Sequence, residues 1–254
     1  MTADSPVKRD SPEMPARLDY ADIRICSSAK LFGQEPDDDP GLLRVSASIT
    51  IADFPDDDLP DDEASPLTEI DGIGLSAVPL DGGGTEITIL RAEGLVLDLY
   101  RIENPFETLD ASSQELVAYA CLFDLKEGRG LDPDLEDRLL GPAIGRVVIA
   151  ESVRIAPAWR GCGGIGRYLA SRLWPVVCPD AALVAIHPFP IDVPRDDAGH
   201  VDKRAFHFTL KQIERTWESI GFEPYKNDIW IMDPSADKHE RAVAKLERKL
   251  GLSA

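Results

Sequence analysis

The segment that most restricts the fold of this chain runs from Arg146 to Trp174. It begins as an apolar stretch with strand-like alternation, passes through four glycines within six residues, and continues with apolar residues at helical spacing. A helix N-terminus that follows a glycine turn presents unpaired backbone N–H groups, the positive end of the helix dipole, and room for a ligand to approach. The segment therefore predicts a strand–turn–helix unit that binds a phosphate or pyrophosphate.

The rest of the chain fits a globular protein that contains such a unit. With 254 residues, of which 43% are hydrophobic, it can bury a proper core. We expect an α/β (α+β) fold with a mixed, mostly antiparallel sheet flanked by helices. Residues 1–19 are expected to form a disordered tail and residues 20–234 the domain. Residues 235–254 are expected to form an amphipathic helix that packs on the domain or on a second subunit.

Local signals give finer expectations. The turn residues at 81–84 predict a hairpin between strands at 73–78 and 85–90, and a separate strand is expected at 95–100. Ser112 and Glu115 form a capping-box pattern that predicts the start of a helix. The apolar residues of that helix would be Leu116, Tyr119, Ala120 and Phe123. Pro175 is expected to end the helix that follows the glycine turn.

Charge and composition exclude some classes of partner. The formal net charge is -19, and residues 1–70 hold 17 acidic and six basic side chains. Such a surface repels nucleic acid and anionic lipid, and it either attracts cationic amines or consists of solvated acidic loops. The apolar runs are too short to cross a membrane, and no secretory signal precedes them. Four scattered cysteines predict reduced thiols in the cytoplasm and no metal site.

The glycine turn admits three interpretations. Gly161, Gly163 and Gly166 satisfy the dinucleotide pattern of a nicotinamide-dependent oxidoreductase. Its context is poor, because residues 156–160 separate the strand from the first glycine and His187 stands where an acidic residue is expected. A turn with a purely structural purpose is the second interpretation, although four glycines exceed that need.

The third interpretation is a resemblance. The pattern Val153-x-Ile155-x-Pro157-x-x-Arg160-Gly161-x-Gly163-Gly164-Ile165-Gly166-x-x-Leu169 resembles the acyl-CoA signature of the GNAT family of N-acetyltransferases. Residues 217–224 and 229–232 resemble the last helix and closing strand of that family, so the resemblance covers about residues 145–233. The loop contains one extra glycine, which places Arg160 one residue early. Trp217 stands where the family often has a proton-donating tyrosine.

The resemblance implies acetyl-CoA as cosubstrate, with its pyrophosphate held by backbone N–H groups of the glycine turn. It also implies that the strand near Val153 separates from its neighbour and pairs with the amides of the pantetheine chain. The residues that would contact the cosubstrate are Val153, Arg154, Ile155, Arg160, Gly161, Cys162, Gly163, Gly164, Ile165, Gly166 and Arg167. The implied reaction is direct attack of an amine on the thioester, with an oxyanion held by a backbone N–H near Val153.

Three residues are candidates for acid–base catalysis. Alternation along residues 145–155 places Glu151 in an apolar row, where its pKa would be raised as a general base requires. An ion pair with Arg146 or Arg154, or a bulge that turns Glu151 to solvent, is the competing interpretation. His187 is a second candidate base, and Tyr225 a candidate proton donor, although packing roles suit both. Cys162 has no histidine partner in the sequence and is a weak candidate nucleophile.

The sequence thus predicts an acyl-CoA-dependent N-acyltransferase, with a non-catalytic acyl-CoA-binding module of the same fold as the alternative. The oxidoreductase is the less favoured third possibility. The expected partners are an acyl-CoA and an amine acceptor, for which a cationic amine suits the acidic surface. The identity of the acceptor and the choice between monomer and homodimer stay open.

Overall fold

The computed structural model describes seven stretches of the chain: residues 21–28, 41–53, 74–80, 84–126, 130–139, 145–190 and 201–252. The expected disordered tail at residues 1–19 lies outside these stretches. Most of the acidic loop after residue 53 also lies outside, as does the greater part of the loop before Val201.

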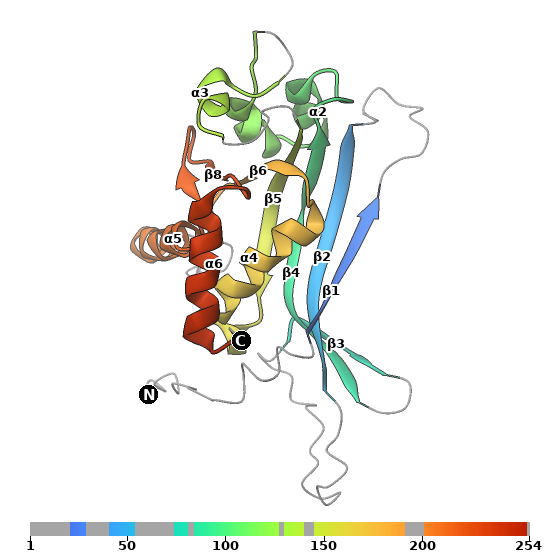
Figure 1. The fold of residues 1–254 in the computed structure, drawn as a ribbon, viewed down its shortest axis with the longest axis vertical. Coiled ribbons are helices and arrows are strands. Elements are labelled where there is room, and N and C mark those ends of the chain that lie inside the picture. The colour runs from blue at the N-terminus through green and yellow to red at the C-terminus, as the bar shows by residue number, and fades with distance from the viewer. Residues whose placement is uncertain are drawn as a thin grey trace, which may run out of the picture.

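The centre of the molecule is an eight-stranded sheet in which seven strands follow the order β1-β2-β4-β5-β6-β8-β7, and β3 pairs with β4 (Figure 1). The strands are β1 (Ala21–Ser28), β2 (Leu42–Asp53), β3 (Ser76–Pro79), β4 (Thr85–Asp98), β5 (Arg146–Ile155), β6 (Ala181–Ile186), β7 (Glu223–Pro224) and β8 (Trp230–Met232). Only the β5–β6 pair is parallel. The expected mixed, mostly antiparallel sheet is confirmed.

Different helices cover the two faces of this sheet. The helical elements are α2 (Pro105–Ser112), η2 (Leu116–Leu122), α3 (Pro133–Glu136), η3 (Pro157–Trp159), α4 (Ile165–Val177), α5 (Lys203–Glu218) and α6 (Asp237–Leu250). Side chains of α4 and α6 pack with one face of the sheet in the first hydrophobic core. Side chains of α2, η2 and α3 pack with the other face in a second core. The central strands of the sheet are therefore covered on both faces.

The C-terminal helix α6 packs on the domain and not away from it. Leu246 belongs to the first core, and Leu250 packs against the same core. Near the start of the helix, the His239 Nδ1 lies 2.8 Å from the carbonyl oxygen of Ile220. A side chain at Gly221 would meet the backbone of His239, with the added Cβ 3.0 Å from its Cα, so the residue after α5 must be small for α6 to approach.

The strand expectations near Gly94 were partly wrong. The hairpin between β3 and β4 is confirmed by their antiparallel pairing. The segments at 85–90 and 95–100, however, form the single long strand β4 rather than two strands. Gly94, which lies between the two expected strands, is paired on both sides, with Val45 of β2 and Ala150 of β5. Pairing with both neighbouring strands therefore carries β4 through this glycine.

Two helix expectations were also wrong. Ser112 ends helix α2 instead of starting a helix, because α2 already begins after a cap at Asn104. The side chain of Asn104 accepts hydrogen bonds from the N–H groups of Phe106 and Glu107. Residues 116–122 then form a 3-10 helix. Pro175 lies inside α4, which continues to Val177. So close to the helix end, proline removes a single backbone hydrogen bond, which the packing of α4 tolerates.

Among the described residues, every helix is too short or too polar to cross a lipid bilayer.

Candidate functional site

A cleft of about 1140 Å³ opens where β5, β6, η2, α4 and α5 meet. All eleven residues that the sequence assigned to the cosubstrate line it, from Val153–Ile155 through Arg160–Arg167. Glu151 and His187 also line it. The fold thus brings together the strand, the glycine turn and two of the three candidate acid–base residues in one cavity.

The cleft exists because β5 and β6 separate partway along their length. Their parallel pairing ends at Ala150 and Ile186, while β5 continues for five more residues to Ile155. In the described part of the chain, no strand pairs with the side of Glu151–Ile155 that faces away from β4. Pro188 and Pro190 come just after His187, the residue that follows β6, and proline has no N–H to extend a ladder. We call the point where the two strands part the fork. This separation is the one expected from the sequence.

A β-bulge next to the fork corrects the expected position of Glu151. Glu93 and Gly94 are adjacent in β4, but they pair with Ser152 and Ala150 of β5, so Glu151 is the extra residue. An extra residue reverses which face the following side chains occupy. Val148 and Ala150, which precede the extra residue, therefore pack in the same core as Val153 and Ile155, which follow it. Without the bulge, even-numbered and odd-numbered residues of β5 would face opposite sides of the sheet. The single apolar row expected along β5 was wrong.

Glu151 nevertheless faces the cleft with a perturbed acidity. Burial raises its pKa above the ordinary value, Arg44 opposes the rise, and the nearby carboxylates of Glu93 and Glu115 add to it. Its side chain is 33% exposed, and its Oε2 lies 4.0 Å from Nη1 of Arg44 on β2. Its cation is thus Arg44, not one of the two arginines of its own strand. A partly exposed contact at this distance is weak, so Glu151 is free to take a proton.

The glycine turn presents open backbone donors at the start of α4. Gly161, Gly163 and Gly164 have φ values of +75°, +61° and +114°, a region that disfavours other residues. In the described structure, the N–H groups of Gly161, Cys162, Gly164, Gly166 and Arg167 donate to no protein acceptor. Gly164 precedes the helix without a side-chain cap. These N–H groups at the positive end of α4 form a binding surface for an anion.

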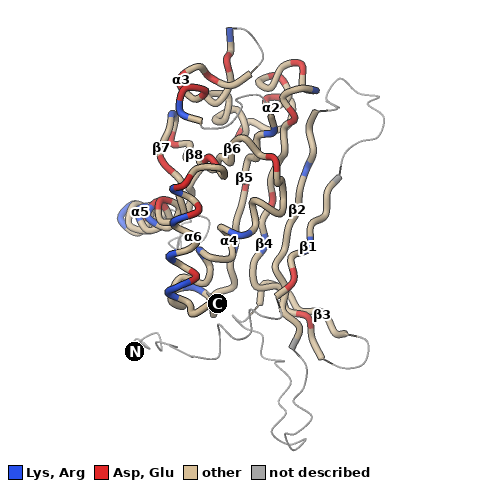
Figure 2. Tube along the Cα trace, viewed as in Figure 1, with Lys and Arg blue, Asp and Glu red and all other residues tan. Residues whose placement is uncertain are grey.

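Four cationic side chains line the cleft: Arg154, Arg160, Arg167 and Lys249. Arg160 donates through Nε to the carbonyl oxygen of Ile155, at 3.0 Å, and Arg167 donates to the Ser219 hydroxyl, at 3.1 Å. Helices α5 and α6 carry nine basic and five acidic residues, in contrast to the acidic chain as a whole (Figure 2). The electrostatic environment of the glycine turn therefore favours an anion.

Lys249 is a cleft residue that the sequence reasoning missed. It lies in the last turn of α6, whose residues Leu246 and Leu250 approach Gly164 and Gly163. The sequence marked α6 as amphipathic, but no local signal indicated which element its apolar side would cover. Contact between α6 and the glycine turn is decided by the tertiary packing.

Tyr119 is the second missed residue, and it lies at the fork. It is 4% exposed, and its hydroxyl lines the cleft between the ends of the paired segments. The hydroxyl donates to the carbonyl oxygen of Ala150, at 3.3 Å, and accepts from the backbone N–H of His187, at 2.9 Å. Burial raises the pKa of Tyr119 well above its ordinary value. The sequence had indicated only an apolar helical position for this residue.

His187 follows β6 at the mouth of the fork. Its side chain is half-buried and lines the cleft, and its ring centroid lies 6.3 Å from that of Phe189. Its backbone N–H is engaged by Tyr119, whereas its imidazole reaches the cavity.

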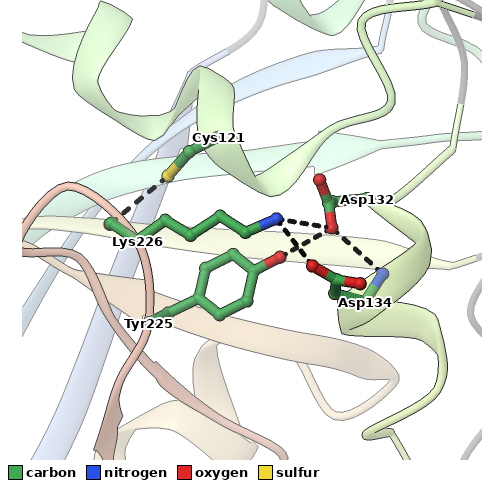
Figure 3. Close-up of polar contacts among 5 residues, drawn as sticks. All are labelled: Cys121, Asp132, Asp134, Tyr225 and Lys226. Carbon is green, nitrogen blue, oxygen red and sulfur yellow. Dashed lines mark hydrogen bonds and ion pairs between the residues drawn. The ribbon is translucent and has the colours of Figure 1, made fainter.

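The structure does not bring Tyr225 into the cleft. Figure 3 shows its hydroxyl directed at Asp132, to which it donates at 2.8 Å. Lys226 donates to the same carboxylate oxygen, at 2.9 Å, and lies 3.1 Å from the carboxylate of Asp134. Burial alone would raise the pKa of Asp132, but the hydrogen bonds from Lys226 and Tyr225 outweigh it and lower this pKa. Tyr225 is thus part of a polar cluster that joins the β7–β8 turn to α3.

Two other residues have roles in packing. Trp217 is 7% exposed and belongs to the first core, where it contacts Phe222 edge to face, with ring centroids 5.1 Å apart. The Cys162 thiol lines the cleft and donates to the carbonyl oxygen of Ala158, at 3.2 Å. Among the described residues, no cluster of three or more histidine, cysteine or acidic side chains could hold a metal ion.

Comparison with protein-family models, with curated proteins and with solved structures found no match for this chain.

Proposed function

We propose that the protein is an acyl-CoA-dependent N-acyltransferase that transfers an acyl group, most simply acetyl, to an amine. The observation that carries the proposal is the continuity of the cleft. The free side of Glu151–Ile155 leads directly to the open N–H groups of Gly161–Arg167. An extended ligand with amides and a terminal pyrophosphate matches both surfaces, because strand edges bind amides and helix N-termini bind phosphates.

The dimensions support this assignment. Five residues of extended strand span roughly 16 Å at about 3.3 Å per residue. A pyrophosphate at the glycine turn would therefore place the other end of an extended ligand near the fork. Glu151 and His187, the two candidate acid–base residues of the cleft, lie at that end of the cavity. The reacting thioester would then lie beside the residues able to move protons.

The proposed reaction needs no covalent enzyme intermediate. The amine nitrogen attacks the thioester carbonyl, a C–N bond forms, the C–S bond breaks, and the sulfur leaves as a thiolate that takes a proton from solvent. Glu151 accepts the proton that the amine loses, since burial holds its pKa closer to neutral than that of an ordinary glutamate. A backbone N–H on the free side of β5 stabilises the oxyanion.

The acceptor end of the cleft favours a cationic amine. Glu115 and Glu151 both line this part of the cavity. Burial raises the pKa of Glu151 and the carboxylate of Glu115 adds to this rise, which a protonated amine bound beside them would oppose.

A non-catalytic acyl-CoA-binding module is the second candidate. It is favoured by the diversion of Tyr225 to Asp132 and by the burial of Trp217 in the core, which leave neither residue as proton donor. A nicotinamide-dependent enzyme is less well supported. The 3-10 helix η3 separates β5 from Gly161, and the residue after β6 is His187 instead of the acidic residue that binds a ribose.

Thermal unfolding in the presence of CoA, acetyl-CoA, NAD and ATP tests the ligand class. A ligand present at 100 times its dissociation constant stabilises the folded state by about 2.7 kcal/mol, which corresponds to a rise of roughly 5–11 °C for a chain of this size. We expect this rise with CoA and acetyl-CoA only. Stabilisation by NAD alone would refute the proposal.

Release of free thiol from acetyl-CoA, measured with a panel of mono- and polyamines, separates the enzyme from the binding module. The enzyme releases thiol in proportion to acceptor concentration. Tight binding of acetyl-CoA with no thiol release on any amine would identify the binding module.

A further inference from the structure

The hydroxyl of Tyr119 lies where the next backbone hydrogen bond between β5 and β6 would form. Ala150 and Ile186 form the last pair of the β5–β6 ladder. The next groups able to bond across the two strands are the carbonyl of Ala150 and the N–H of His187. Tyr119 contacts both, because its hydroxyl accepts from the N–H of His187, at 2.9 Å, and donates to the carbonyl of Ala150, at 3.3 Å.

Both backbone groups are therefore satisfied without pairing to each other. An unpaired buried N–H or carbonyl is costly, so without the hydroxyl the two strands would be driven to pair one step further. One further step would bring His187 towards β5 and narrow the cleft beside Glu151. The hydroxyl inserted between the strands removes that driving force.

The position of the Tyr119 ring does not depend on its hydroxyl. Leu116 and Leu122, at the two ends of η2, are buried in the second core. The thiol of Cys121 donates to the carbonyl oxygen of Lys226, at 3.5 Å, and so ties η2 to the polar cluster in Figure 3. A phenylalanine at position 119 would consequently keep the ring packed while it removes both hydrogen bonds.

We propose that Tyr119 is a positioning residue that keeps the fork open and so sets the shape of the cleft for the ligand that lies along β5. The inference rests on the proposed function for the identity of that ligand, but the effect on the strands can be measured without it.

The test compares Y119F with Y168F. Tyr168 is a half-buried tyrosine of α4 whose hydroxyl makes no hydrogen bond within the described structure and does not line the cleft. Each variant is characterised by the dissociation constant of CoA, by KM and kcat for acetyl-CoA, and by a crystal structure without ligand.

We expect Y119F to bind CoA roughly fivefold to tenfold more weakly than wild type, the effect of losing one ordinary hydrogen bond. KM for acetyl-CoA should rise by a similar factor with little change in kcat, whereas Y168F should match the wild type in both constants. The crystal structure of Y119F should show the N–H of His187 bonded directly to the carbonyl oxygen of Ala150.

Two results would overturn the inference. One is a Y119F structure in which a water molecule replaces the hydroxyl and the strands keep their separation. The other is a direct His187–Ala150 hydrogen bond that leaves CoA affinity and KM at wild-type values. If wild-type protein does not bind CoA, the proposed function fails, and the Y119F structure alone then decides whether the hydroxyl holds the fork open.

Discussion

Replacing Gly94 with alanine would disrupt the bulge that places Glu151 in the cleft. A Cβ at position 94 would lie 2.2 Å from the carbonyl oxygen of Ile149 and 3.3 Å from the Cα of Ala150. All the atoms it meets belong to the backbone of β5. Because β4 lies between β2 and β5 and pairs with both, neither strand can move without breaking ladder hydrogen bonds.

The size of the effect follows from this geometry. A carbon and an oxygen in contact normally stay about 3.3 Å apart, so the two strands must separate by about 1 Å at this point. Overpacking of this kind costs about 3 kcal/mol. Alanine also restricts the unfolded chain more than glycine does, and this stabilises the folded state by up to about 1 kcal/mol. We expect a net loss of about 2 kcal/mol in the free energy of unfolding, or roughly 4–8 °C in Tm.

The matched control is G145A. A Cβ at Gly145 would lie 3.4 Å from the Cβ of Ala182, an ordinary contact. Urea unfolding followed by circular dichroism should place G145A within about 0.5 kcal/mol of the wild type and G94A well below it. Equal stability of the two variants would show that the strands can yield at the bulge and would refute the reasoning.

Four further predictions concern the cleft and the polar cluster. Transfer rates of the wild type should fall as the pH drops through the raised pKa of Glu151, because the protonated carboxyl can no longer act as a base. The variant E151Q should lose roughly a hundredfold or more in kcat at every pH. A normal rate in E151Q would exclude Glu151 as the base. Because a raised carboxyl pKa means that the folded state favours the protonated form, the wild type loses stability as the pH rises through that pKa. E151Q should therefore be at least as stable as the wild type at about pH 7, with no advantage at about pH 3, in urea titrations at both values. Y225F should lose about 1 kcal/mol of stability in the same assay, from the missing hydrogen bond to Asp132, and keep wild-type thiol release; a large loss of kcat with normal stability would return Tyr225 to the reaction. R167Q should bind CoA roughly tenfold more weakly than the wild type, and its affinity should depend less on salt, because the substitution removes a positive charge beside the glycine turn. Calorimetric titration at two salt concentrations measures both effects. R172Q, on the same helix but paired with Glu247 outside the cleft, should bind normally, and equal affinities of these two variants would contradict an anion site at the turn.

Much of the fold could be read from the sequence where the signals are local. The end of β5, the glycine turn and the start of α4 follow one another within 20 residues, and their order is dictated by alternation, glycine content and helical spacing. Asp202 caps α5 through local contacts as well, because its side chain accepts hydrogen bonds from the N–H groups of Arg204 and Ala205. In each case the interacting groups are close in the chain, so residue types alone fix the outcome.

The site was predicted less completely, because its shape depends on pairing between distant strands. A bulge at Glu151 was one of the alternatives that the sequence left open, and the sequence of β5 could not decide it, since the bulge arises from the register with β4, about 58 residues earlier. Tyr225 carried a functional group suited to proton donation, but its direction is set by Asp132, 93 residues away in the chain. Residue type indicated what each side chain could do and not what it would face.

The amino-acid sequence by itself determined the class of fold, the glycine turn before α4 and the strand that supplies one wall of the cleft. The tertiary structure alone decided that the hydroxyl of Tyr119 lies between β5 and β6, that Lys249 lines the cleft, and that Arg44 rather than an arginine of β5 pairs with Glu151. The physical reason is the range of the interactions. Helix caps and turns are settled within a few residues, whereas register, bulges and helix docking minimise the energy of the whole packed sheet.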